Sequence, residues 1–179
     1  MTSILRILSC HKFILAFAGL ISALALAAAF ASEIFLGLEP CILCIYQRYP
    51  FAIVMLLSLI FLVAFRKSDK SMRIGLVFCA LVMLANSGIA TYHTGVEQKW
   101  WDSTEACTFN LPLDEEQNWL ENIMSAPMGR CDEIPWQDPI LGLSMANYNI
   151  MLCFGLFVLC LLSAGIKPRN REETKPQPE

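Results

Sequence analysis

Charged residues are scarce in this chain of 179 residues, since Asp, Glu, Lys and Arg together make up 16% of it. Hydrophobic residues account for 56%, and the mean hydropathy is +0.52. Soluble domains carry about 25% charged residues, so this composition excludes an ordinary soluble protein. The sequence also lacks an internal repeat, and it lacks the alternation of strands and helices that a thioredoxin fold requires.

Four long apolar stretches account for this composition. Each reaches the roughly 20 residues that a helix needs to cross the hydrocarbon core of a bilayer. A helix satisfies its backbone polar groups within one segment, so lipid favours this structure for each stretch. The expected fold is therefore an all-α membrane protein, a bundle of four transmembrane helices. The stretches are residues 14–35, 46–65, 74–92 and 141–166.

The first stretch has an alternative interpretation as a cleaved signal peptide. Arg6 and Lys12 resemble the basic n-region of such a peptide, and Ala29-Phe30-Ala31 matches the small-residue cleavage pattern. The apolar run is longer than a usual h-region, however. Its removal would also reverse the sides of the membrane on which the Lys and Arg residues described next fall. We therefore expect this stretch to remain in the protein as a span.

The distribution of Lys and Arg predicts the orientation of the bundle. Ten of the thirteen basic residues fall before the first span, between the second and third spans, or after the fourth. Such residues mark the cytoplasmic side, so both termini are predicted to be cytoplasmic. Twelve of the sixteen acidic residues fall on the other side, and nothing indicates nucleic-acid binding. The ten are Arg6, Lys12, Arg66, Lys67, Lys70, Arg73, Lys167, Arg169, Arg171 and Lys175.

The outer loop of residues 94–139 is the one sizeable part outside the predicted spans of a single membrane domain, residues 1–166. Asp114 to Gln117 resembles a capping box and precedes an apolar face, which predicts a short helix on the membrane surface. The charged, Pro-rich tail of residues 167–179 is expected to be disordered. Three tryptophans are expected to anchor the loop at the interface: Trp100, Trp101 and Trp136.

The motif Cys41-Ile42-Leu43-Cys44 stands at the outer start of the second span. A bridge over so short a loop stabilises a fold by only about 2 kcal/mol, so it is a weak structural staple. A pair this close opens and closes easily, as thiol–disulfide exchange requires. No His follows Cys44, which excludes covalent haem attachment. The motif therefore predicts a redox pair set against lipid, where the natural electron acceptor is lipid-soluble.

Topology places four of the eight cysteines on the outer side, and such an even set favours disulfides in an oxidising compartment. Four cysteines allow three pairings. Cys107 and Cys131 bound a loop of 25 residues, where a bridge is either a staple worth about 3–4 kcal/mol or a redox pair open to a partner. The lack of a second C-x-x-C argues against a zinc site, so no metal is expected. The remaining cysteines, Cys10, Cys79, Cys153 and Cys160, are expected to be packing residues.

Two further residues are candidates for contact with an electron acceptor. Arg48 lies four residues after Cys44, hence on the same helix face, and its charge together with the helix N-terminus favours a thiolate there. Arg48 is suited to hold a quinone carbonyl oxygen, the alternative being an arginine that snorkels to lipid head groups. His93, at the outer end of the third span, is suited to bond a second carbonyl or to move a proton. A plain interfacial histidine is the alternative for His93.

Several features together resemble one known family. Pro40-Cys41-Ile42-Leu43-Cys44 with Arg48 heads the second span, and a second cysteine pair lies in the long outer loop. The stretch Cys131-Asp132-Glu133-Ile134-Pro135-Trp136 precedes Gly142-Leu143-Ser144-Met145 at the start of the fourth span. With four spans and both termini inside, the chain resembles the disulfide bond formation protein B (DsbB) family over about residues 10–165.

The resemblance implies an inner-membrane enzyme, a dithiol:quinone oxidoreductase that reoxidises a periplasmic DsbA-type thiol oxidase and so supports disulfide formation. Its cofactor would be ubiquinone or menaquinone. The resemblance also implies the pairs Cys41–Cys44 and Cys107–Cys131. Cys107 would form a mixed disulfide with the reduced partner, and Cys41 would accept electrons from the loop pair. Cys44 would form the thiolate–quinone charge-transfer species, with Arg48 at the quinone.

His93 falls near a histidine implicated in that family, so it joins Arg48 as an expected quinone-binding residue. The flanking Gly95-Val96-Glu97 and the 23 residues between the loop cysteines differ from the well-studied enterobacterial type. Two alternatives stay open at this point. One is a vitamin K epoxide reductase-like protein, although its C-x-x-C lies late in the chain. The other is a non-catalytic membrane protein whose disulfides are structural.

Overall fold

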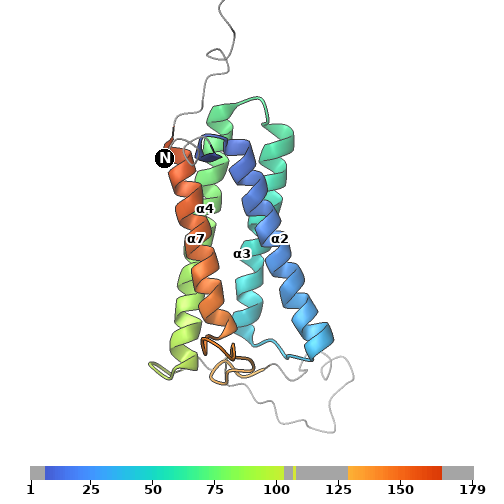
Figure 1. The fold of residues 1–179 in the computed structure, drawn as a ribbon, viewed down its shortest axis with the longest axis vertical. Coiled ribbons are helices and arrows are strands. Elements are labelled where there is room, and N and C mark those ends of the chain that lie inside the picture. Colours follow the sequence, from blue (N-terminus) through green and yellow to red (C-terminus); the bar gives the residue numbers. More distant parts are fainter. Residues whose placement is uncertain (1–6, 103–106, 108–128, 167–179) are drawn as a thin grey trace, which may run out of the picture.

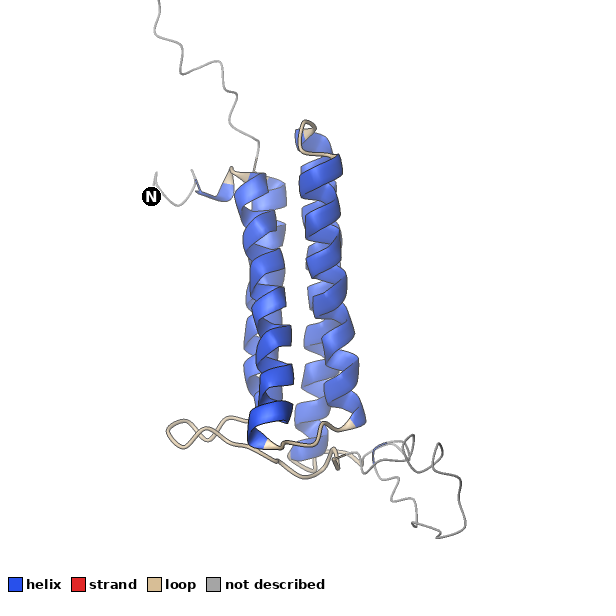
Figure 2. Cartoon of the chain, turned by 90° about the vertical axis from the view of Figure 1, so that its right-hand side faces the viewer, coloured by secondary structure: helices blue, strands red, loops and turns tan. Residues whose placement is uncertain are grey.

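The computed structural model describes residues 7–102, 107 and 129–166. Four long helices form a bundle, and no strand is assigned in the described part (Figures 1 and 2). Each helix is long and apolar enough to cross a membrane, which confirms the predicted all-α fold with four membrane helices. The helices are α2 (His11–Leu36), α3 (Ile42–Ala64), α4 (Asp69–Glu97) and α7 (Met145–Gly165).

The ends of these helices follow from local capping. Cys41 is the N-cap of α3, and its sulfur accepts a hydrogen bond from the backbone N–H of Cys44 at 3.3 Å. The helix therefore begins at Ile42, earlier than the apolar stretch suggests, and Pro40 precedes the N-cap. Gly37 ends α2 with a left-handed φ of 62°, a conformation that costs glycine little.

The outer end of α4 extends beyond the sequence-based boundary. The helix continues to Glu97, so residues 94–97 are helical and not part of the outer loop. Trp101 folds back onto this end, where its Nε1 donates a hydrogen bond to the carbonyl of Tyr92 at 3.1 Å and its ring stacks on the Tyr92 ring. Trp101 also packs directly over Gly95. Trp101 is therefore held against the end of α4, and its anchoring at the membrane interface stays a prediction.

The bundle core is apolar and includes sulfur. Cys79, Cys153 and Cys160 are fully buried among aliphatic residues, which confirms their predicted packing role. Cys10 is exposed at the start of α2, so the packing prediction is wrong for it. Helix α4 packs most extensively against α7, and α2 against α3. The remaining surface of the spans is largely unburied, as expected of side chains that face lipid.

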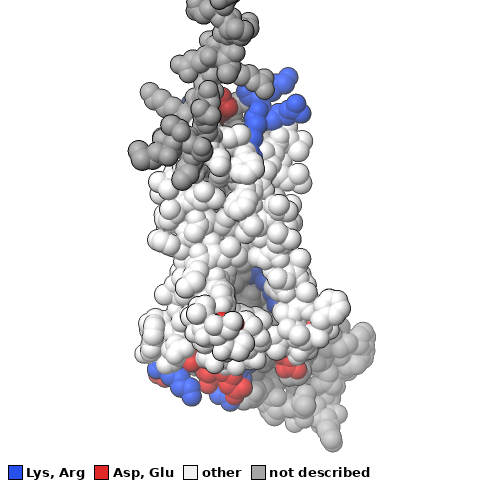
Figure 3. Space-filling view, viewed as in Figure 1, with Lys and Arg blue, Asp and Glu red and all other residues white. Residues whose placement is uncertain are grey.

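Most of the charged surface lies at the two ends of the bundle. The start of α2, the α3–α4 connection and the end of α7 share one end, and the α2–α3 connection and residues 129–144 share the other (Figure 1). Figure 3 shows an uncharged surface between these ends, with a basic side chain set in a hollow. The cytoplasmic placement of both termini stays a prediction. The expected surface helix after Asp114 and the tail of residues 167–179 lie outside the described residues.

The close approach of α2 to α3 gives a testable prediction. A Cβ atom added at Gly19 would lie 2.8 Å from Cβ of Ser58, which is too close for either helix to keep its place. We expect Gly19→Ala to lower the free energy of unfolding by about 1–3 kcal/mol through overpacking. Gly155→Ala is the matched control, because nothing lies within 4 Å of the added Cβ there. Thermal unfolding in detergent measures both, and equal midpoints for the two variants would contradict the packing.

Candidate redox site at the outer end of the bundle

The C-x-x-C motif forms the N-terminal turn of α3. The chain changes from extended backbone at Cys41 to helix at Ile42, and this change brings the two cysteines of the motif together. The thiol of Cys41 donates a hydrogen bond to Sγ of Cys44 at 3.1 Å. Cys41 is 4% exposed and Cys44 is half-buried, so the pair lies just beneath the outer surface.

The two loop cysteines join the same cluster. Cys107 and Cys131 are buried beside Cys41, Leu43 and Val96, although they are far from them in sequence. Cys131 lies in one buried cluster with both Cys41 and Cys107 and interacts with each of them. The four outer cysteines therefore form one chain of contacts in the order Cys107, Cys131, Cys41, Cys44. Their covalent pairing stays a prediction.

The acidity of these thiols varies along the chain of contacts. The hydrogen bond from Cys131 lowers the pKa of Cys41, but the bond to Cys44 and burial raise it more, to about 12. Donation to Cys41, followed by burial, raises the pKa of Cys131 well above its ordinary value. Both thiols therefore keep their protons at neutral pH. A negative charge in the cluster is best placed on Cys44, whose sulfur accepts the hydrogen bond from Cys41.

His93 is part of the cluster and is not a plain interfacial histidine. It is 3% exposed, and its Nε2 lies 3.4 Å from Sγ of Cys41. The Sγ atoms of Cys41 and Cys44 and a ring nitrogen of His93 all lie within 4.8 Å of one another. The imidazole is thus placed to exchange a hydrogen bond or a proton with the thiol pair.

A buried polar network fixes the His93 ring. Nε2 of Gln47 hydrogen-bonds His93 Nδ1 at 3.1 Å, and Nδ2 of Asn149 donates to Oε1 of Gln47 at 2.6 Å. Cys153 donates to Oδ1 of Asn149, and Nδ2 of Asn86 donates to the carbonyl of Gln47. Because an unsatisfied polar group is costly in an apolar interior, this network holds α3, α4 and α7 in one register.

Glu97 follows His93 by one helical turn and is also buried, with 7% of the residue exposed. Its Oε1 lies 3.7 Å from Nε2 of His93. Its Oε2 accepts a hydrogen bond from the hydroxyl of Ser144 at 2.5 Å. Ser144 is the N-cap of α7, so the carboxyl group also lies at the positive end of that helix dipole.

Arg48 points toward α2 instead of toward head groups. Its Nη2 lies 2.5 Å from Oε1 of Glu33, and its guanidinium lies 5.1 Å from the centroid of the Phe30 ring. Both charged side chains are largely shielded from solvent. The ion pair and the cation–π contact hold the guanidinium in place, so the snorkelling alternative does not describe it.

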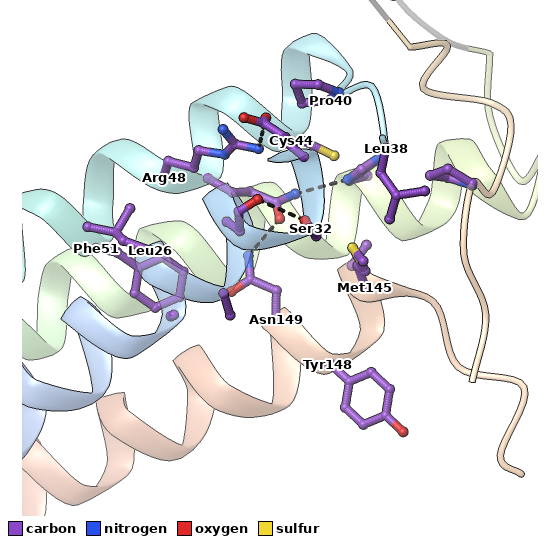
Figure 4. Close-up of a pocket in the computed structure, with 18 of the residues that line it drawn as sticks. Leu26, Ser32, Leu38, Pro40, Cys44, Arg48, Phe51, Met145, Tyr148 and Asn149 are labelled. Atoms are coloured by element: carbon purple, nitrogen blue, oxygen red, sulfur yellow. Dashed lines mark hydrogen bonds and ion pairs between the residues drawn. The ribbon is translucent and has the colours of Figure 1, made fainter. Parts of the chain in front are cut away.

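A cavity of about 320 Å³ lies beside Arg48 and Cys44, between α2, α3 and α7 (Figure 4). Its wall is mainly apolar, with Leu26 and Phe51 on the helices and Pro40 at its outer end. A few polar groups reach it, among them Cys44, Arg48 and Asn149. An apolar wall with a few polar groups is typical of a site for a flat, lipid-soluble molecule.

A second hollow of about 340 Å³ lies on the outer side of the cysteines. Arg130 and Glu133 line it at its exposed rim, and Cys41 and Glu97 line it further in. Cys44 and His93 line both this hollow and the apolar cavity. Together with four other shared lining residues, they stand where the hollow with the charged rim meets the apolar cavity.

The structure brings together the cysteines and His93 that the sequence singled out, and it places Arg48 at the adjoining cavity. Their chemical roles stay predictions. Sequence reasoning missed Glu33, Gln47, Asn149 and Glu97. For Glu97 a signal existed, because it follows His93 at the i,i+4 spacing that places two side chains on one helix face. The partners of Gln47 and Arg48 come from other helices, and no spacing within one helix reveals them.

Comparison with known proteins identifies the family. The family described as "Disulfide bond formation protein DsbB" matches residues 11–163. A disulfide bond formation protein B of Xanthomonas oryzae pv. oryzae is 34% identical over 151 residues, covering 81% of this chain and 84% of the relative. The protein of that name in Xylella fastidiosa is 31% identical over 153 residues, covering 82% and 85%.

An uncharacterized protein of Rickettsia prowazekii is 28% identical over 147 residues, covering 79% of this chain and 82% of the relative. No solved structure matches the chain. These matches favour the DsbB family over a vitamin K epoxide reductase-like protein. The chain belongs to the DsbB family and is a membrane protein of disulfide bond formation.

Proposed function

We propose that the chain oxidises a periplasmic DsbA-type dithiol protein and passes the electrons through its two cysteine pairs to a membrane quinone. The carrying observation is the chain of contacts from Cys107 through Cys131 and Cys41 to Cys44, which ends at an apolar cavity. Disulfides that served only as staples would need no contact between the sulfurs of two different pairs. Thiol–disulfide exchange requires such contact.

The first half of the proposed reaction takes place at the loop cysteines. A thiolate of the reduced partner forms a bond with Sγ of Cys107, and the Cys107–Cys131 bond breaks. The sulfur of Cys131 then bonds to Cys41 while the Cys41–Cys44 bond breaks, and Cys44 leaves as a thiolate. The burial of Cys131 and Cys41 in one cluster supports this transfer, because it keeps the attacking and accepting cysteines together.

The cycle closes without gain or loss of atoms. The second thiol of the partner attacks the mixed disulfide, so the partner leaves oxidised and Cys107 is free to re-form its bond with Cys131. When Cys107 re-forms its bond with Cys131, the bond between Cys131 and Cys41 breaks. Cys41 is then a thiol beside the Cys44 thiolate. Two electrons then leave the Cys41–Cys44 pair for the acceptor, and the pair becomes a disulfide again.

The cavity residues fit a quinone. The mainly apolar wall suits a lipid-soluble ring, and the guanidinium of Arg48 supplies a fixed positive charge near Cys44. A quinone bound there supplies the two-electron, two-proton acceptor. Arg48 and His93 would hold its oxygen atoms, and Cys44 would face the ring. We propose the bacterial inner membrane as the location, with the cysteines on the periplasmic side, where disulfides persist.

Replacement of Cys44 tests the relay. We expect Cys44→Ser to abolish quinone reduction in purified protein supplied with a reduced DsbA-type partner, because the electrons then have no thiolate at the cavity. Exchange between the partner and the loop pair should persist, as a trapped mixed disulfide. Loss of quinone absorbance and gel analysis measure the two steps.

Cys160→Ala is the matched control for Cys44→Ser, since Cys160 is a fully buried cysteine of the core, away from the outer cluster. It should reduce quinone at the wild-type rate. Full activity of Cys44→Ser would refute the relay, and no activity of the wild type with ubiquinone or menaquinone would refute the proposed function.

Replacement of Arg48 tests the quinone site. A hydrogen bond from a charged group contributes about 1.5–3 kcal/mol, so Arg48→Ala should raise the quinone concentration needed for half-maximal rate by about tenfold to a hundredfold. The rate of exchange with the partner should not change. Arg66→Ala, at the opposite end of the bundle, controls for loss of positive charge, and an unchanged quinone dependence of Arg48→Ala would remove Arg48 from the site.

Glu33→Gln separates the role of Arg48 from that of its ion pair. This variant keeps the guanidinium but removes the charge that holds it at 2.5 Å. We expect a smaller loss of quinone affinity than for Arg48→Ala, because the Phe30 contact still orients the guanidinium. Equal losses in the two variants would show that the ion pair, and not Arg48 itself, is what the cavity requires.

A further inference from the structure

Glu97 is a buried carboxyl group that the proposed relay does not use. Among the described residues no Lys or Arg forms an ion pair with it, and its polar contacts are the Ser144 hydroxyl and the His93 ring. A buried carboxylate without a cationic partner is costly in surroundings of low dielectric constant. Such a group responds strongly when a neighbouring charge appears or disappears.

The neighbouring charge that changes during the relay is that of the cysteine pair. Glu97 lies beside Cys44, which becomes a thiolate when its disulfide opens: Oε1 of Glu97 is 3.7 Å from Nε2 of His93, and a ring nitrogen of His93 lies within 4.8 Å of Sγ of Cys44. Two like charges repel each other more strongly in a buried site than in bulk water. A thiolate at Cys44 and a carboxylate at Glu97 are therefore unfavourable together. Reduction of the cysteine pair is thus coupled to protonation of Glu97.

The other titratable groups around Glu97 do not remove this conflict. Arg130 is the basic residue at the rim of the outer hollow, but Asp132 and Glu133 already hold its guanidinium. The remaining groups are acids, thiols or the imidazole, and none of them brings a permanent positive charge. The titratable and charged groups that line the hollow with Glu97 are Glu39, Cys41, Cys44, His93, Arg130 and Glu133.

We propose that Glu97 is a redox-linked proton site for the Cys41–Cys44 pair, which binds a proton when the disulfide is reduced and releases it when the disulfide re-forms. The inference rests on the proposed function insofar as this pair is the redox couple next to the quinone. It assigns to Glu97 a role that is separate from holding quinone. In this role Glu97 is a proton-carrying residue that acts through His93 and the thiols.

The protons and electrons balance with this assignment. In the reduced state Cys41 is a thiol, Cys44 is a thiolate and Glu97 is a carboxylic acid, so two protons accompany the two electrons. Oxidation of the pair forms the Cys41–Cys44 bond and releases both electrons and both protons, one from the Cys41 thiol and one from Glu97. Quinone reduction to quinol consumes the same two electrons and two protons.

The geometry supplies a path for the proton. His93 Nε2 lies 3.7 Å from Oε1 of Glu97 and 3.4 Å from Sγ of Cys41, so the imidazole stands between the carboxyl and the thiol. His93 also lines the apolar cavity, whereas Glu97 lines the outer hollow. A proton taken up by Glu97 from the outer side thus reaches either the pair or the cavity through one side chain.

The test measures the midpoint potential of the Cys41–Cys44 pair against pH, without quinone or partner. Full-length protein in detergent is equilibrated with thiol–disulfide redox buffers, and peptide mass spectrometry after alkylation gives the oxidised fraction of this pair. Around neutral pH the midpoint potential of the wild type should fall with rising pH at the slope expected for two protons taken up with two electrons. Glu97→Gln, which keeps an oxygen for the Ser144 hydrogen bond, should show the slope of one proton.

Two further variants sharpen the comparison. Glu133→Gln removes a carboxylate from the exposed rim of the same hollow and should keep the wild-type slope. Glu97→Asp keeps an ionisable group, so its slope should lie between those of Glu97→Gln and the wild type. A Glu97→Gln slope equal to that of the wild type would overturn the proposal, and so would an equal change in Glu133→Gln.

The outcome also separates this inference from the proposed function. If the slopes differ as expected but the wild type does not reduce quinone, the proton site stands and the quinone step is wrong. If quinone is reduced and the slopes are equal, the relay stands and Glu97 has a structural role. A normal rate of partner exchange in Glu97→Gln shows that the variant is folded.

Discussion

The contact between Cys131 and Cys41 is the interaction on which the site depends. It joins a long outer loop to the first turn of α3, and without it the loop cysteines and the C-x-x-C pair would be two separate features. Cys41 is the N-cap residue, so it lies at the very end of α3, and its sulfur meets both the first turn of the helix and the buried cluster with the loop cysteines. The pKa of Cys41 is raised by its bond to Cys44 and by burial, and that of Cys131 by its interaction with Cys41 and by burial, which leaves Cys44 as the place for charge.

The bundle supports this contact with a polar network inside an apolar fold. Gln47 from α3, Asn86 from α4 and Asn149 from α7 bond to one another or to neighbouring backbone, and they hold the His93 ring against Cys41. In lipid the hydrophobic effect does not distinguish one helix register from another, whereas such hydrogen bonds do. The same network that fixes the helices therefore fixes the redox residues.

The sequence was sufficient for the four-helix fold because the length and apolar composition of each span are local properties. It was also sufficient for Cys41, Cys44 and His93 as candidates, since their types and positions carry chemical meaning. It could not show the Glu33–Arg48 ion pair or the Asn149–Gln47 bond, because these join helices whose mutual rotation no single span encodes. Glu97 was misplaced in a loop because hydropathy falls before the helix ends.

The most direct test of the account is whether Cys131 and Cys41 form a disulfide when their usual partners are absent. The variant Cys44→Ser, Cys107→Ser leaves these two as the outer thiols, and mild oxidation of the purified protein followed by non-reducing peptide mass spectrometry reads their state. We predict a Cys41–Cys131 disulfide in most molecules. Two free thiols after oxidation would contradict the contact and, with it, the transfer of electrons from the loop to the membrane pair.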